Sequence, residues 1–251
     1  MKTFLILIAL VMSTFTYAGS GISQYNDHAK QVMLERFSNV ADHLFEASHK
    51  TGINMAELTA IASLESKLQT KVKNPNSTAT GVLQYTKRTW KYKRGKYAQE
   101  LGIDSNAQPI NPRANLLIGS KDLSQTKEWL IENTHLTNET VRLGDVYISH
   151  FLGENGAVKL INSYSHKPIN QIVTIHKGNS RYYYKPNGQI RTAREFRLYM
   201  DELAKNELAV YEKVIMEYQV KRFFEPVHNF IDNIRSVGQV VMLAKSTIPI
   251  T

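Results

Sequence analysis

The chain contains no cysteine among its 251 residues. A disulfide framework, a thiolate metal site, a cysteine nucleophile and a lipid attached to an N-terminal cysteine are therefore excluded. A recognised nucleic-acid-binding motif is also lacking, although the chain carries 31 Lys and Arg against 22 Asp and Glu. The fold must rest on its hydrophobic core, and the excess of positive charge needs another explanation.

A long apolar run occurs at the N-terminus, where Met1-Lys2 precedes an apolar or hydroxylic stretch from Thr3 to Thr16. Ala18, followed by Gly19-Ser20, offers a small-residue cleavage site, so residues 1–18 are predicted to be a secretory signal peptide. A retained membrane anchor is the alternative, but the run is shorter than the roughly 20 residues of a spanning helix. Cleavage would leave 30 basic and 22 acidic residues, a formal charge of +8. We expect an exported, periplasmic or extracellular protein that meets anionic envelope polymers and no nucleic acid.

Strand patterns are scarce, whereas apolar residues recur every three or four positions between Asp27 and Leu160. With 42% hydrophobic and 21% charged residues, the chain suits one or two globular domains. The predicted fold class is mainly α. The predicted organisation is a signal peptide at 1–18, a helical domain at 19–200 and a C-terminal helical extension at 201–251.

An acidic residue interrupts the helical pattern that Asn54 begins as a predicted N-cap. At 100° per residue, Glu65 falls in the middle of the apolar arc, and Lys67 and Ala60 fall on the opposite side. A carboxylate on a core-facing stripe is costly to desolvate unless it is paired, protonated or at the floor of a cleft. A protonated carboxyl group in a cleft has the properties of a general acid.

Four blocks follow in order along the chain: Glu65-Ser66, Gly81-Val82-Leu83-Gln84, Asn111-Pro112 with Asn115, and the segment from Tyr147 to Gly153. This order resembles the catalytic domain of the soluble lytic transglycosylases, in the lysozyme superfamily, over roughly residues 42–199. The last block departs from the commonest Ala-Tyr-Asn-Ala-Gly form. Its His-Phe-Leu-Gly ending resembles the branch found in phage tail-associated and other virus-borne enzymes.

The resemblance implies a lysozyme-like fold and cleavage of the β-1,4 bond between N-acetylmuramic acid and N-acetylglucosamine in peptidoglycan. Glu65 would act as general acid and then as general base, with formation of a 1,6-anhydro sugar. The residues expected to bind substrate are Ser66, Gly81, Gln84, Tyr85, Asn115, Tyr147 and His150. No cofactor and no metal are expected.

The sequence allows two or more roles for several of these residues. Taken alone, Gly81 to Tyr85 is typical of a turn into a helix. Asn115 is expected either on an exposed helix face or facing the cleft, where it would orient the surroundings of Glu65. Either Tyr147 or His150 is expected to contact the Glu65 region. A hydrolytic muramidase and a non-catalytic wall-binding protein are the alternative functions, although no second acid has a cleft-facing pattern as clear as that of Glu65.

A long helix is predicted from Thr192 to about Phe224, where Pro226 interrupts it. The following segment from Val227 to Leu243 is amphipathic but too charged to span a bilayer. It is expected to fold back on the domain, to bind a protein partner or to lie on a membrane surface.

Overall fold

The computed structural model describes residues 25–175 and 177–246, with side chains as far as residue 226 except at 177. The predicted signal peptide lies outside these residues. The helices in chain order are α2 (Asp27–Thr51), α3 (Met55–Ser66), α4 (Lys87–Leu101), α5 (Pro112–Asn133), α6 (Leu143–Leu152), α7 (Glu154–Ile161), η1 (Ile169–Gln171), η2 (Lys177–Asn179), α8 (Ser180–Tyr183) and α9 (Ala193–Ser246). Within the described ranges β-structure is limited to isolated bridges, so the predicted mainly α class is confirmed.

The centre of the domain is α3. Nine of its twelve residues are buried, including Ala60 on the side that the sequence pattern had placed opposite the core. A helix that is apolar all round is a fully enclosed helix. Here α2 and α9 pack against α3, and α9 covers the face that carries Ala60. Lys67 is not part of the helix but its C-cap, in the left-handed conformation with a φ of 52°.

Two helix starts that position the site follow directly from the sequence. The Asn54 side chain accepts hydrogen bonds from the backbone N–H groups of Ala56 and Glu57, which confirms it as the N-cap of α3. Asn111 caps α5 in the same way by accepting from Ala114, with Pro112 at the first helical position. The ends of the two helices are therefore set locally.

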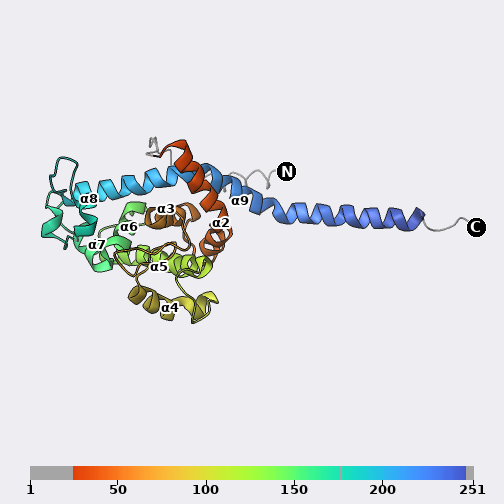
Figure 1. Cartoon of the computed structure of the whole chain (residues 1–251), viewed down its shortest axis with the longest axis horizontal. Helices are drawn as coiled ribbons and strands as arrows, with labels where there is room; N and C mark the ends of the chain where they lie inside the picture. Colours follow the sequence, from red (N-terminus) through yellow and green to blue (C-terminus); the bar gives the residue numbers. More distant parts are fainter. Residues whose placement is uncertain (1–24, 176, 247–251) are drawn as a thin grey trace, which may run out of the picture.

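The last helix, α9, is continuous through Pro226, so the expected interruption at this residue is wrong. A proline removes one backbone donor and crowds the preceding turn, but the turns on either side keep their own hydrogen bonds. The helix runs along the domain in contact with α2, α3 and α6 and then extends away from it (Figure 1). The backbone therefore does not fold back on the domain, and the side chains from Val227 onward lie outside the described ones.

The first half of α9 is part of the core, because Met200, Ala204, Tyr211 and Ile215 are all fully buried. Farther along, Met216, Val220 and Phe223 are exposed. The predicted domain boundary at residue 200 thus falls within a helix that packs on the domain for four further turns. Among the described residues, no helix is long and apolar enough to cross a membrane.

Candidate active site

Glu65 lies in the last turn of α3, and 17% of its side chain is exposed. Burial raises the pKa of the Glu65 carboxyl group above its ordinary value, against the opposing effects of a nearby His150 and of a hydrogen bond from Tyr147. Desolvation is the largest of these effects, and it favours the neutral, protonated form. Glu65 is therefore an acid whose proton is held more tightly than that of a solvated glutamic acid.

Both aromatic residues proposed from the sequence reach Glu65, because Tyr147 and His150 lie one turn apart on α6. Tyr147 is a buried residue, and the nearby Glu65 carboxyl group adds to the effect of burial in raising the pKa of its hydroxyl. His150 Nε2 lies 3.8 Å from Glu65 Oε1 and 3.2 Å from the carbonyl oxygen of Leu83. The carbonyl can only accept, so the Nε2–H tautomer of His150 satisfies this contact.

The segment from Gly81 to Tyr85 is a tight loop that faces the same region. Gly81 has a φ of 82°, and a Cβ atom there would lie 2.0 Å from the carbonyl oxygen of Pro109. The close approach that requires glycine is thus to the protein's own backbone. Gln84 also has a positive φ of 48°, and its side-chain amide donates to the carbonyl oxygen of Gly81 at 2.8 Å.

Asn115 holds this loop in place from inside the protein. Its side chain is fully buried, its Oδ1 accepts from the Leu83 N–H at 2.8 Å, and its Nδ2 donates to the Pro109 carbonyl at 2.9 Å. The expectation of an exposed Asn115 is therefore wrong, whereas a role in orienting the surroundings of Glu65 stays a prediction. With no exposed surface, the side chain positions the loop and is not available to a substrate.

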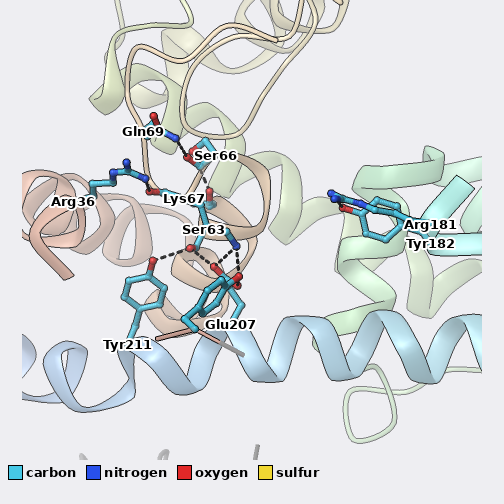
Figure 2. A network of polar contacts seen from close by, with 11 residues as sticks. Arg36, Ser63, Ser66, Lys67, Gln69, Arg181, Tyr182, Glu207 and Tyr211 are labelled. Atoms are coloured by element: carbon cyan, nitrogen blue, oxygen red, sulfur yellow. Dashed lines mark hydrogen bonds and ion pairs between the residues drawn. The ribbon is translucent and has the colours of Figure 1, made fainter. Parts of the chain in front are cut away.

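Ser66 is likewise directed into the protein. Its side chain is 6% exposed and donates to the carbonyl oxygen of Ala62 in the preceding turn, at 3.2 Å. The Gln69 side chain in turn donates to the Ser66 carbonyl at 3.0 Å, as Figure 2 shows. Ser66 therefore stabilises the end of α3, and it differs in this from the expected substrate-binding role.

A polar cavity of about 250 Å³ adjoins Glu65 through His150. Its wall is formed by residues of the Gly81–Tyr85 loop, α4, α5, α6 and the start of α7. These are Gln84, Tyr85, Thr86, Thr89, Lys93, Asp122, Leu123, Thr126, Ser149, His150, Gly153 and Glu154. Six of these twelve residues carry a hydroxyl or amide group, and such groups suit a ligand rich in hydroxyls and acetamides.

One charged group in this cavity was missed from the sequence. Asp122 is 7% exposed, accepts a hydrogen bond from the Tyr85 hydroxyl at 2.9 Å and forms an ion pair with Lys93. Lys93 also lies 3.7 Å from Glu154, whose side chain is 46% exposed. Both additional acids of the cavity therefore share one lysine. Tyr85, which also makes an edge contact with His150, has a pKa well above its usual range because it is buried beside Asp122.

A signal for Asp122 was present in the sequence. Asn115, Gly119, Asp122 and Thr126 recur at helical spacing along α5, and all except glycine are polar residues with little exposure. A polar stripe on a helix is normally solvated, and only the packing of the Gly81–Tyr85 loop and of α4 shows that this one is enclosed.

These features define a helical domain in which one desolvated acid lies next to His150, a residue of the cavity wall. Residues 42–138 match the family model of the transglycosylase SLT domain. The matched range includes Glu65, the Gly81–Tyr85 loop and Asn115, and it ends before α6. The resemblance seen in the sequence is confirmed for this range, whereas the likeness of 147–153 to virus-borne enzymes stays a prediction.

Among solved structures, the chain is similar to an inactive mutant of the lytic transglycosylase Slt from Pseudomonas aeruginosa. The TM-score is 0.41 and the identity 15%, over 82% of this chain and 27% of that chain. The chain thus spans about a quarter of the length of that structure.

Proposed function

We propose that the chain is an exported lytic transglycosylase that cleaves the bond between N-acetylmuramic acid and N-acetylglucosamine in peptidoglycan, with Glu65 as the single acid and base. The observation that carries the proposal is the desolvated carboxyl group of Glu65 beside the polar cavity, within a range that matches the transglycosylase SLT domain. The basic composition suits an anionic glycan with carboxylate-bearing peptides.

In the first step, protonated Glu65 donates its proton to the glycosidic oxygen. The bond from that oxygen to the anomeric carbon breaks, and the carbonyl oxygen of the muramic acid N-acetyl group bonds to the anomeric carbon in its place. The raised pKa keeps this proton bound at a higher pH than in a solvated glutamic acid. The Tyr147 hydroxyl then stabilises the carboxylate that remains.

In the second step, the Glu65 carboxylate removes the proton from the 6-hydroxyl of the same sugar. The hydroxyl oxygen attacks the anomeric carbon and displaces the acetamide oxygen, so that a 1,6-anhydro sugar forms and Glu65 is protonated again. No water enters the product. One group thus serves first as general acid and then as general base.

The state of the other acids of the cavity favours this route over hydrolysis. An inverting hydrolase needs a second carboxylate that is free to activate water. Asp122 is occupied by Lys93 and Tyr85, and Glu154 lies on the exposed side of the same lysine. A hydrolytic muramidase therefore remains the second candidate, which the reaction products separate from the first.

The test is digestion of purified peptidoglycan by the wild type and by Glu65→Gln, with mass analysis of the released muropeptides. We expect anhydro products from the wild type and a rate lower by about 10²–10⁴ for Glu65→Gln, since general acid–base catalysis contributes that much. Glu128→Gln, on the exposed side of α5, is the matched control and should retain full activity.

Three results would contradict the proposal in different ways. Products heavier by one water would indicate a hydrolytic muramidase. Undiminished release by Glu65→Gln would remove Glu65 from the reaction. Binding of peptidoglycan by the wild type without any release would indicate a wall-binding protein.

A further inference from the structure

Glu207, in the first half of α9, carries a carboxylate with no exposed surface. A buried charge is stable only if it is paired and hydrogen-bonded. Glu207 lies outside the range that matches the family model and takes no part in the cavity beside Glu65. Its burial therefore needs an explanation of its own.

The partners of Glu207 come from α3 and from the start of the described chain. The Ser63 hydroxyl donates to Oε1, the Lys67 ammonium lies 2.8 Å from the same oxygen, and the Tyr25 hydroxyl donates to Oε2 at 2.7 Å. The Tyr211 hydroxyl, one turn farther along α9, lies 2.7 Å from Ser63 Oγ. Figure 2 shows the Glu207 carboxylate beside Ser63 and Lys67, with Tyr211 bonded to Ser63.

Two partners of Glu207, Ser63 in α3 and its C-cap Lys67, flank Glu65 in the sequence. Ser63 and Lys67 are four positions apart and share one side of the helix end, whereas Glu65, halfway between them, points to the opposite side. Lys67 also ends the helix, because its backbone N–H donates to the Ser63 carbonyl at 2.7 Å. The Glu207 carboxylate thus binds the last turn of α3 on one side, while Glu65 lies on the other side, next to Tyr147 and His150.

The same helix also fixes the opposite wall of the site. Arg197 of α9 forms a bidentate pair with Asp145 of α6, at 2.9 and 3.0 Å. Gly144 is so close to α9 that an added Cβ would lie 2.4 Å from the Cα atom of Asp201. Because α6 carries Tyr147 and His150, α9 holds both helices that meet at Glu65.

We propose that Glu207 is a positioning residue for Glu65: it holds the last turn of α3 so that the Glu65 carboxyl group stays packed against Tyr147 and His150. This inference rests on the proposed function for its effect on turnover. Its structural part, the placement and dehydration of Glu65, can be measured without turnover.

The central experiment compares Glu207→Gln with Glu202→Gln, an exposed position five residues earlier on α9. Glutamine keeps the shape of Glu207 but leaves the Lys67 ammonium without its counter-charge. We expect kcat to fall by about 10–100-fold, because small misplacements of a catalytic group have effects of this size. KM should change little, since the substrate-binding surface of the cavity is untouched. Glu202→Gln should match the wild type.

A second measurement follows Glu65 itself. The ¹³C resonance of its carboxyl group, assigned by its loss in Glu65→Gln, is titrated in the wild type and in Glu207→Gln. If the last turn of α3 loosens, water reaches Glu65, and its pKa should fall toward the ordinary value. The basic limb of the pH profile of kcat/KM should move to lower pH by the same amount.

Thermal unfolding keeps these results separate from a loss of fold, since all assays are run where the variants are fully native. Ser63→Ala, which removes one bond to Glu207 and no charge, provides a milder variant and should lower kcat in the same direction. A native Glu207→Gln with the wild-type kcat and an unchanged Glu65 titration would overturn the inference. A shifted Glu65 titration in a protein without transglycosylase activity would uphold the positioning role and reject the proposed function.

Discussion

Asn115 offers a quantitative test of how the Gly81–Tyr85 loop is held, through the substitution Asn115→Ala. The change removes one acceptor and one donor, so the buried Leu83 N–H and the Pro109 carbonyl both lose their partner. A buried polar group without a partner costs about 1–3 kcal/mol. For the two groups together we expect the free energy of unfolding to fall by about 3–5 kcal/mol, a large part of the 5–15 kcal/mol of a typical domain.

Urea denaturation followed by circular dichroism measures this loss as a lower midpoint at an unchanged slope. Asn111→Ala, four residues earlier, is the matched control, because it removes only the N-cap bond of α5 and should cost about 1 kcal/mol. Asn115→Asp tests the direction in which stability changes with pH. Its buried carboxyl group can donate to Pro109 only when protonated, so we expect its folded-state pKa to be raised and this variant to gain stability as the pH falls.

If Asn115→Ala proves no more destabilising than Asn111→Ala, the interpretation fails. Water would then satisfy Leu83 and Pro109 as well as the amide does, and the loop would not depend on Asn115.

Two other predictions concern stability. Gly81→Ala should lower the free energy of unfolding by about 3–5 kcal/mol, because of the positive φ and the clash with Pro109. Gly52 has a φ of 76° but open space around it, so Gly52→Ala should cost about 1 kcal/mol in the same thermal melts. Equal losses for the two variants would argue against the clash. Glu65→Gln should be more stable than the wild type near pH 7. The folded wild type binds the Glu65 proton more tightly than the unfolded chain, so its stability falls as the pH rises from the unfolded-state pKa to the folded-state pKa of Glu65. The advantage should vanish as the pH falls toward about 4, where glutamic acid is protonated in both states, and a Gln variant that is less stable at pH 7 would contradict the assignment.

The local features of this fold were predictable because they depend on neighbours in the sequence. The caps at Asn54 and Asn111 need only a side-chain oxygen and the following backbone N–H groups. Glu65 stood out because one acid broke an apolar period, and the structure places it in a desolvated position.

Features that depend on distant contacts were not predictable in this way. The side of α3 that carries Ala60 is buried because α9 covers it, and α9 begins more than a hundred residues later. Asn115 bonds to a loop and not to its own helix, so helical period alone could not assign its partner. Glu207 interrupts the buried positions Ala204, Leu208 and Tyr211 as Glu65 interrupts its own stripe, and the same reasoning would have identified it.

The hydrogen bond between Glu207 and Ser63 affects when, during synthesis, the active site can form. The two residues are 144 positions apart, and a chain emerges from the ribosome with its N-terminus first. All of the range that matches the transglycosylase SLT domain is synthesised before Glu207 exists. On the proposed positioning role, a growing or prematurely ended chain would carry every residue of the cleft and still hold Glu65 loosely. The protein would become catalytically active only after α9 has been synthesised and has packed on the domain, well after the synthesis of the residues that perform the chemistry.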